Sequence, residues 1–468
     1  MNVLFIIPPD SEVKDNKQIG SIFPRIGVAY IVSYLRQHSI DVGILDCKGE
    51  KIKYDEIRKR ILSYNPDIVA LTAFTEEIYE AVKVCKICKE ININIITVIG
   101  GPHASAIPER TLSEFPVIDV VVYGEGEQTL LEIAELNGRK LDNVDGIAYR
   151  NEKHNIILNK SRENIKDIDS IPFPAWDLFS LDNYRGILTD KLNEKINSNV
   201  LELPILSARG CPYKCNFCYK VYGTTLRLRN PAKIVDEIEY DIKRYKANQF
   251  FFVEGTFGIN KTWGVELCNE IIKRGLNNKI KWVAETRVDA TEELLIKMKE
   301  AGCILVGFGV ESGDSKIFEN SGKGISMNQV RSAIGISKKL GFIVECFFII
   351  GHPYETKESI NKTIDFAEEL DPDIFNLGIM IPYPGTEIQA MAEKGIGNYV
   401  LLSQNWSEYT KQRGGTLELK DISIDDLRKI QSRAYLRFYI RPRRIIKMLK
   451  TLPISKLLKI SVSVLKGI

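Results

Sequence analysis

Short apolar runs alternate with helical stretches along most of this 468-residue chain. In its first part, five β-branched runs are separated by stretches with apolar residues at helical spacing. The runs lie at 3–7, 42–45, 67–72, 94–99 and 118–123. This alternation predicts a parallel sheet covered by helices, because parallel strands need crossover connections. We therefore expect residues 1–140 to form a doubly wound, Rossmann-like α/β domain that binds its ligand at the carboxyl ends of the strands.

A second series of strand and helix signals follows between residues 201 and 390. Six candidate strands lie at 203–208, 249–253, 280–286, 304–310, 343–350 and 374–381. Six strand–helix units fall short of the eight that close a TIM barrel, so we expect a partial (β/α)6 barrel of TIM type. In such barrels the chemistry takes place at the carboxyl ends of the strands.

Two regions lack this alternation. Residues 141–200 are polar and irregular, and they predict a linker with a small hairpin. Residues 391–468 predict a helical, basic C-terminal region, with a helix over 421–439. From Arg441 to the end there are eight Lys or Arg and no Asp or Glu. This tail fits either a helix over the open edge of the barrel or contact with an anionic membrane surface. We expect no nucleic-acid partner, because no aromatic residue follows Tyr439 for base stacking.

Three of the nine cysteines are clustered directly after the first strand of the second series. They are Cys211, Cys215 and Cys218, and three thiolates are one short of a closed zinc site or a fully ligated [4Fe–4S] cluster. The next cysteine, Cys268, lies in a helical pattern, so neither a zinc ribbon nor a bacterial ferredoxin fits. A [4Fe–4S] cluster held here would leave one iron open to another ligand. A clustered metal site without a secretory leader favours a reducing cytoplasm.

The spacing Cys211-x-x-x-Cys215-x-Phe217-Cys218 resembles the signature of radical S-adenosylmethionine (SAM) enzymes. In that family SAM chelates the open iron, and one electron from the cluster cleaves its sulfonium to a radical that abstracts hydrogen from an unactivated carbon. The chain is similar to the subgroup with an N-terminal cobalamin-binding domain over about residues 1–390. The segments that carry this likeness are 24–35, 100–104, 124–127, 282–289, 301–313, 323–324, 348–356 and 382–386.

The resemblance also implies which residues contact SAM at the ends of the barrel strands. Phe217 stands beside the cluster cysteines. The other positions are expected to hold the methionyl amine (Glu254, Gly255, Thr256), the carboxylate or ribose (Arg287, Glu311, Ser312) and the adenine (Gly351).

For cobalamin, the resemblance implies binding by the strand-end loops of the first domain. The residues are Pro8, Thr72, Gly100, Gly101, His103, Gly124, Glu125 and Gly126. The best-known cobalamin domains use an Asp-x-His-x-x-Gly loop whose histidine ligates cobalt, and this chain has none. Many radical enzymes of the subgroup also lack it, so cobalamin remains the expected cofactor. The alternative is a degenerate domain retained as a scaffold.

These features predict a cobalamin-dependent radical SAM methyltransferase that acts on an unactivated carbon or phosphorus centre of a small molecule or lipid. It would need an electron donor such as flavodoxin or ferredoxin. One alternative keeps the radical chemistry for cyclisation, carbon–carbon coupling or rearrangement without methyl transfer. A different class is a non-catalytic iron–sulfur scaffold or redox protein. No motif names the substrate or a catalytic residue. We expect a cytoplasmic protein, membrane-associated if its tail contacts lipid.

Overall fold

The computed structural model describes residues 1–10, 23–186, 200–410, 414–441 and 444. The chain divides into two compact units, which we treat separately. The sheet unit comprises Met1–Arg185, Ala208–Pro212 and Tyr219–Lys233. The barrel unit comprises Gly186–Ser207, Tyr213–Cys218 and Ile234–Ile468. By this division Cys211 belongs to the sheet unit, and Cys215 and Cys218 belong to the barrel unit.

The sheet unit is built on seven strands in the order β2-β1-β3-β4-β5-β6-β7. The first five are parallel: β1 (Asn2–Ile7), β2 (Asp41–Asp46), β3 (Ile68–Thr72), β4 (Ile96–Gly100) and β5 (Val120–Val122). This confirms the predicted doubly wound sheet, whose order reverses direction beside β1. The hairpin β6 (Ile147–Arg150) and β7 (Ile156–Leu158) lies in the stretch expected as a linker, and it extends the sheet antiparallel to β5.

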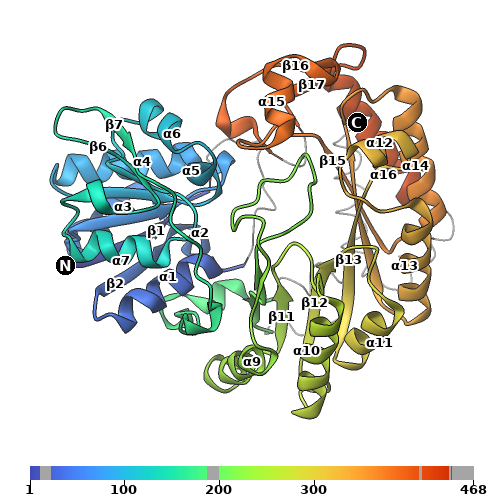
Figure 1. Cartoon of the computed structure of the whole chain (residues 1–468), viewed down its shortest axis with the longest axis horizontal. Helices are drawn as coiled ribbons and strands as arrows, with labels where there is room; N and C mark the ends of the chain where they lie inside the picture. The colour runs from blue at the N-terminus through green and yellow to red at the C-terminus, as the bar shows by residue number, and fades with distance from the viewer. Residues whose placement is uncertain (11–22, 187–199, 411–413, 442–443, 445–468) are drawn as a thin grey trace. The chain divides into compact units, whose positions relative to one another are not determined.

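Helices cover both faces of this sheet (Figure 1). Helices α1 (Ile26–Gln37) and α7 (Glu127–Glu135) pack together, as do α3 (Tyr54–Tyr64) and α4 (Ile78–Ile91). Each presents an apolar stripe to the strands, for example Val28, Val32 and Leu35 of α1, which are buried. Two shorter helices follow strand ends, α2 (Cys47–Glu50) and α5 (Pro102–Ala106), and α6 (Pro108–Glu114) follows α5.

The barrel unit contains six parallel strands in sequential order, β15-β14-β13-β12-β11-β8. They are β8 (Glu202–Ile205), β11 (Gln249–Phe252), β12 (Lys281–Thr286), β13 (Cys303–Glu311), β14 (Ile343–Ile350) and β15 (Ile374–Ile379). Sequential order with a helix after each strand is the pattern of a TIM-type barrel, and six strands confirm the predicted partial (β/α)6 form. The predicted strand 203–208 ends at Ile205, and the separate β9 (Ala208–Arg209) pairs with β10 (Arg227–Leu228).

The helices of the barrel unit lie outside the curved sheet (Figure 1). They are α9 (Pro231–Tyr245), α10 (Lys261–Lys273), α11 (Glu292–Glu300), α12 (Ser315–Asn320), α13 (Met327–Lys339) and α14 (Lys357–Leu370). Inside the strands the rings of Phe252, Phe257 and Trp282 pack with centroids 5.0 to 5.2 Å apart. This aromatic contact joins the carboxyl end of β11 and the loop after it to β12.

The C-terminal region closes the free edge of the barrel sheet. It contains α15 (Glu387–Glu393), a hairpin of β16 (Tyr399–Leu401) and β17 (Leu417–Leu419), and α16 (Ile424–Tyr439). The backbone N–H groups of Phe375 and Leu377 on edge strand β15 donate to the hydroxyls of Tyr439 and Tyr435 on α16, at 3.1 and 3.0 Å. Helix α16 thereby satisfies donors that an edge strand would leave open.

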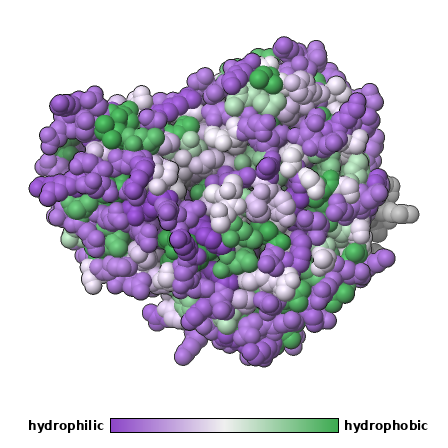
Figure 2. Space-filling view, in the orientation of Figure 1, coloured by the Kyte–Doolittle hydropathy of each residue, from purple (hydrophilic) through white to green (hydrophobic). Residues whose placement is uncertain are grey.

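The basic tail expected after this helix lies mostly outside the described residues. Among the residues that are described, no helix combines the length and apolar character that membrane crossing requires. Figure 2 shows apolar residues in separate patches among hydrophilic ones on the face in view. Exposed apolar side chains at the barrel's C-terminal hairpin include Ile396, Val400 and Leu402.

Candidate active site

Burial separates the three clustered cysteines from the other six. Cys211 and Cys215 are half-buried and Cys218 is exposed. The remaining cysteines are buried: Cys47, Cys85, Cys88, Cys268, Cys303 and Cys346. Burial raises the pKa of Cys88 to about 12 and the pKa of the other buried thiols further still. Metal ligation needs thiolates, which the buried cysteines form less readily. The loop with Cys211, Cys215 and Cys218 is therefore the better source of thiolate ligands.

The donor atoms that the loop offers are three thiols. Within the described residues, no three His, Cys, Asp or Glu side chains converge as the ligands of one metal ion would. A cubane cluster is larger than an ion, and its thiolates stand further apart. Three accessible thiols on one loop, with no fourth, match a [4Fe–4S] cluster with an open iron.

The part of this loop in the barrel unit is anchored through Asn216. Its backbone N–H donates to the carbonyl of Ser321 at 3.2 Å, and its carbonyl accepts from the N–H of Ile388 at the start of α15 at the same distance. Gly322 allows the approach: it has φ +71°, and a Cβ there would lie 2.4 Å from the carbonyl oxygen of Lys214. The segment after α12 therefore fixes the backbone that carries Cys215 and Cys218.

An aromatic pair lies beside this anchor. The ring of Phe217 meets the ring of His352 edge-on, with centroids 6.3 Å apart. His352 follows β14 and is 1% exposed, and neither ring nitrogen has a well-formed hydrogen bond within the described structure. Burial lowers the pKa of His352 to about 4, so its imidazole is neutral. The sequence placed His352 in the segment 348–356 that carries the family likeness, but no role was assigned to it.

Glu355 organises the same strand end. One of its carboxylate oxygens accepts the backbone N–H groups of Gly351 at 2.6 Å and His352 at 3.0 Å. Burial raises the pKa of Glu355 to about 8, although these two N–H groups lower it. Gly351 has φ +88°, a conformation that favours glycine. Gly351 was predicted to lie near the adenine, and the structure places it in this turn.

Arg287 and Glu311, which were predicted to contact SAM, form a charged cluster with Lys323 at the ends of β12 and β13. The ammonium of Lys323 pairs with the carboxylate of Glu311 at 2.5 Å, and both side chains are 8% exposed. The guanidinium of Arg287 donates to the backbone carbonyl of Lys323 at 2.7 Å and lies 3.5 Å from the ring centroid of Tyr213 in the cysteine loop. The structure thus brings Arg287 and Glu311 together through Lys323.

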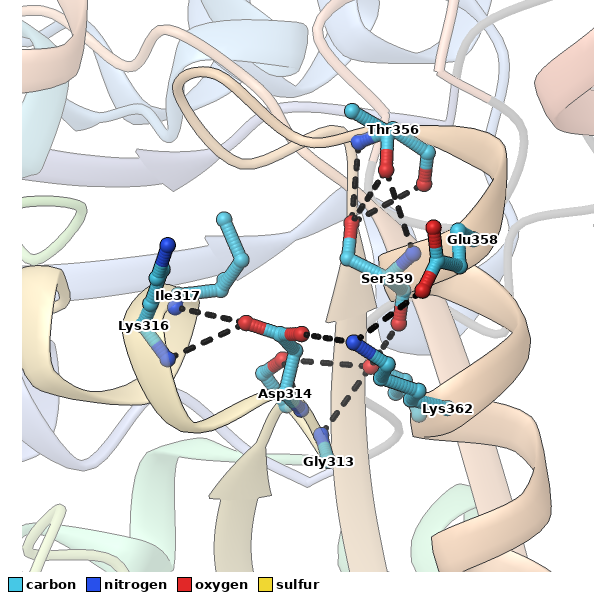
Figure 3. Close-up of polar contacts among 10 residues, drawn as sticks. Gly313, Asp314, Lys316, Ile317, Thr356, Glu358, Ser359 and Lys362 are labelled. Atoms are coloured by element: carbon cyan, nitrogen blue, oxygen red, sulfur yellow. Dashed lines mark hydrogen bonds and ion pairs between the residues drawn. The ribbon is translucent and has the colours of Figure 1, made fainter.

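Ser312 was predicted to bind SAM, and its side chain has structural partners. Its hydroxyl is fully buried, lies 3.1 Å from the hydroxyl of Thr363, and accepts the N–H of Asp314 at 3.1 Å. Asp314 in turn caps α12 by accepting the N–H of Ile317 and pairs with Lys362 at 3.2 Å (Figure 3). These contacts tie the end of β13 to α14, so Ser312 shapes the turn whether or not it touches a ligand.

The strand end of β11 carries the predicted amine site. Glu254 is buried and accepts hydrogen bonds from the hydroxyl and the backbone N–H of Ser207, the latter at 3.3 Å. The hydroxyl of Thr256 donates to the carbonyl of Gly255 at 2.6 Å. Glu254 therefore stands close to the end of β8, a contact between neighbouring strands that the sequence did not reveal.

In the sheet unit, the predicted cobalamin residues lie at the carboxyl ends of the strands. Gly101 has φ +94°, and a Cβ there would lie 2.6 Å from the hydroxyl oxygen of Thr72, so the ends of β3 and β4 meet closely. Pro8 and His103 are buried, and burial lowers the pKa of His103 to about 3. Glu125 is also buried. The side chains of His103 and Glu125 thus lie within the domain and not on its surface.

A cationic group that the sequence reasoning missed lies at the same edge. Arg25 and Lys48 both pair with Glu77, the second at 3.1 Å, and the two cations are about one-seventh exposed. The guanidinium of Arg25 also lies 4.3 Å from the ring centroid of Phe74, which is 37% exposed. These side chains could receive an anionic or flat ligand at the strand ends.

Comparisons with known proteins agree with this division. Residues 15–134 match the model of the B12 binding domain, and residues 205–367 match the radical SAM superfamily. An uncharacterized methyltransferase of Pyrococcus horikoshii is 36% identical over 453 residues, covering 96% of this chain and 94% of the relative. The anaerobic magnesium-protoporphyrin IX monomethyl ester cyclase of Rubrivivax gelatinosus is 32% identical, covering 84% and 70%.

Solved structures show the same fold. The cobalamin-dependent SAM radical enzyme OxsB, solved with aqua-cobalamin and SAM bound, superposes with a TM-score of 0.72 at 18% identity, covering 96% of this chain and 70% of that chain. The order of a B12 binding domain before a radical SAM domain is thus supported by sequence and fold together. The chain belongs to the radical SAM superfamily, in the group of enzymes with a B12 binding domain, and its cofactors are a [4Fe–4S] cluster, SAM and cobalamin.

Proposed function

We propose that this protein is a cobalamin-dependent radical SAM methyltransferase whose cluster is held by Cys211, Cys215 and Cys218. The observation that carries the proposal is the match along 96% of the chain to a relative named as a methyltransferase. Other relatives are named as a hopanoid methylase and a phosphonate methyltransferase. The substrate we propose is accordingly a small molecule or lipid with an unactivated carbon or phosphorus centre.

The chain's own residues have distinct tasks in this proposal. When bound, the cofactors supply a hydrogen-abstracting radical and a methyl group. The three thiolates hold the cluster and leave one iron open. The Glu311–Lys323–Arg287 cluster and Glu254 orient the polar end of SAM, since they lie at the strand ends and are buried. His352 and Phe217 present an apolar, neutral wall that keeps water from the reacting atoms.

Partners and location belong to the proposal as well. We infer an electron donor such as flavodoxin or ferredoxin, because the half-exposed cluster loop needs one-electron reduction. The clustered cysteines, which fit a metal site and not a disulfide framework, favour a cytoplasmic location. Contact of the basic C-terminal tail with anionic lipid would bring the enzyme to a lipid substrate.

One experiment separates the candidates. Reduced, anaerobically reconstituted enzyme with hydroxocobalamin and SAM is assayed for 5′-deoxyadenosine and S-adenosylhomocysteine. A methyltransferase of this kind forms both, because one SAM yields the radical and another donates methyl. The 32% identical cyclase favours a second candidate, ring closure without methyl transfer, which gives 5′-deoxyadenosine without S-adenosylhomocysteine. Formation of neither product would support the iron–sulfur scaffold.

A further inference from the structure

The Gly124–Glu127 loop after β5 is held in a buried network of opposite charges. Glu125 accepts hydrogen bonds from Arg209 at 3.1 Å, from Arg227 at 3.0 Å and from the backbone N–H of Ile165 at 2.7 Å. Glu127 accepts from the other terminal nitrogen of Arg209 at 2.5 Å. The four charged side chains are at most 8% exposed. The charges of the two carboxylates and the two guanidiniums balance. Both carboxylates are therefore already paired with arginines of this chain.

Arg209 lies two residues before Cys211, the first cluster cysteine. Arg209 is the last residue of β9 and lies opposite Arg227 of β10 in the antiparallel register. Both arginines therefore belong to one small two-stranded sheet. Gly210 follows with φ +84°, and a Cβ there would come within 2.0 Å of the carbonyl oxygen of Thr225. The N–H of Cys211 then donates to the carbonyl of Gly223 at 3.1 Å. The backbone of Cys211 is therefore fixed two residues after a clamped arginine, inside the sheet unit.

We propose that Arg209 is a positioning residue for the iron–sulfur cluster. Clamped between Glu125 and Glu127, it fixes the strand that presents Cys211, and the closed network sets the charge beside that cysteine. The proposal rests on the three cysteines holding the cluster. It also changes the reading of the Gly-Glu-Gly-Glu loop: its two carboxylates bind Arg209 and Arg227 and do not bind cobalamin.

The network makes the effect of a charge change predictable. Glu127→Gln removes one negative charge and leaves two arginines facing one carboxylate in a buried site. A positive charge near a cluster favours its reduced, more negative state, so the midpoint potential should rise. The substitution also weakens a charged hydrogen bond that holds the strand. We therefore expect iron release to become roughly tenfold faster.

The test uses the full chain, reconstituted anaerobically with iron, sulfide and hydroxocobalamin. Glu127→Gln and Arg209→Lys are compared with Glu132→Gln, which removes a carboxylate that pairs with Arg162 on the exposed side of the same unit. Three readouts are taken: the midpoint potential from the EPR signal of the reduced cluster, iron release to a chelator, and cobalamin affinity from the corrin absorbance. Arg209→Lys keeps the charge but has a single donor nitrogen in place of the two that bind Glu125 and Glu127, so it carries the test if Glu127→Gln does not fold.

We expect Glu127→Gln to raise the potential and speed iron release, with cobalamin affinity unchanged. Arg209→Lys should speed iron release with little change in potential, and Glu132→Gln should leave all three readouts unchanged. An unchanged potential and unchanged iron release in Glu127→Gln and Arg209→Lys would overturn the proposal. So would lost cobalamin binding with the cluster intact. Failure of the cluster assignment itself would appear separately, as iron retained after all three cysteines are replaced by alanine.

Discussion

The buried ion pair between Lys323 and Glu311 offers a quantitative test of the barrel mouth. Lys323→Met keeps the length and apolar stem of the side chain but removes its charge. Glu311 would then be a buried carboxylate without its cation, and the carbonyl of Gly309 would also lose a donor. Breaking a buried pair by removing one partner costs about 3–5 kcal/mol. At roughly 2–4 °C per kcal/mol for a unit of this size, the Tm of the barrel unit should fall by about 6–20 °C.

The matched control is Lys362→Met in the same unit. Lys362 pairs with Asp314 at 3.2 Å, but its side chain is 53% exposed, so the loss should stay below about 1 kcal/mol. Thermal unfolding of the cofactor-free protein, followed by tryptophan fluorescence, gives the Tm of both variants, and urea unfolding gives the difference in unfolding free energy.

The double variant Lys323→Met/Glu311→Gln should recover much of the stability, because no buried charge then remains. The reasoning would be refuted if Lys323→Met cost no more than Lys362→Met.

Three further changes test other parts of the account. The pKa of Glu355 is about 8 in the folded protein and 4.5 ordinarily, so the free energy of unfolding should fall as pH rises from about 4.5 to 8. Glu355→Gln should remove this pH dependence, which urea unfolding at successive pH values measures. Gly322→Ala would place a Cβ 2.4 Å from the carbonyl oxygen of Lys214 at φ +71°, so iron content after reconstitution should fall, whereas Gly335→Ala, with open space around its Cβ, should retain iron. Tyr435→Phe should expose the N–H of Leu377 on edge strand β15 and cost about 1 kcal/mol in unfolding free energy, and an unchanged value would show that α16 does not cap this edge.

The sequence predicted the elements of both sheets because their signals are local. Alternation of apolar runs and helical stretches located the five parallel strands of the first sheet and the six of the second. This pattern did not reveal that β8 ends at Ile205, because the apolar run continues to Ala208. The hairpin β6–β7 was expected in a linker, and its pairing with β5 depends on edge contacts that a pattern of residues does not contain.

The candidate site shows the same limit. The cysteine spacing is local and was read directly, but the partners of Glu125 lie 84 and 102 residues further along the chain. A Gly-Glu-Gly-Glu loop at a strand end therefore looked like a ligand loop, while its carboxylates bind arginines. His352 and Lys323 lie in segments that carry the family likeness but were assigned no role, because their contacts with Phe217 and Glu311 join different parts of the chain.

The central claim is that Cys211, Cys215 and Cys218 hold one [4Fe–4S] cluster, and iron analysis after anaerobic reconstitution tests it most directly. The parent protein should bind about four irons per chain. A Cys85→Ala/Cys88→Ala control, which alters two buried thiols of α4, should bind as many. The triple alanine variant of the loop should bind none. Retention of four irons by the triple variant, or their loss from the Cys85/Cys88 control alone, would contradict the account.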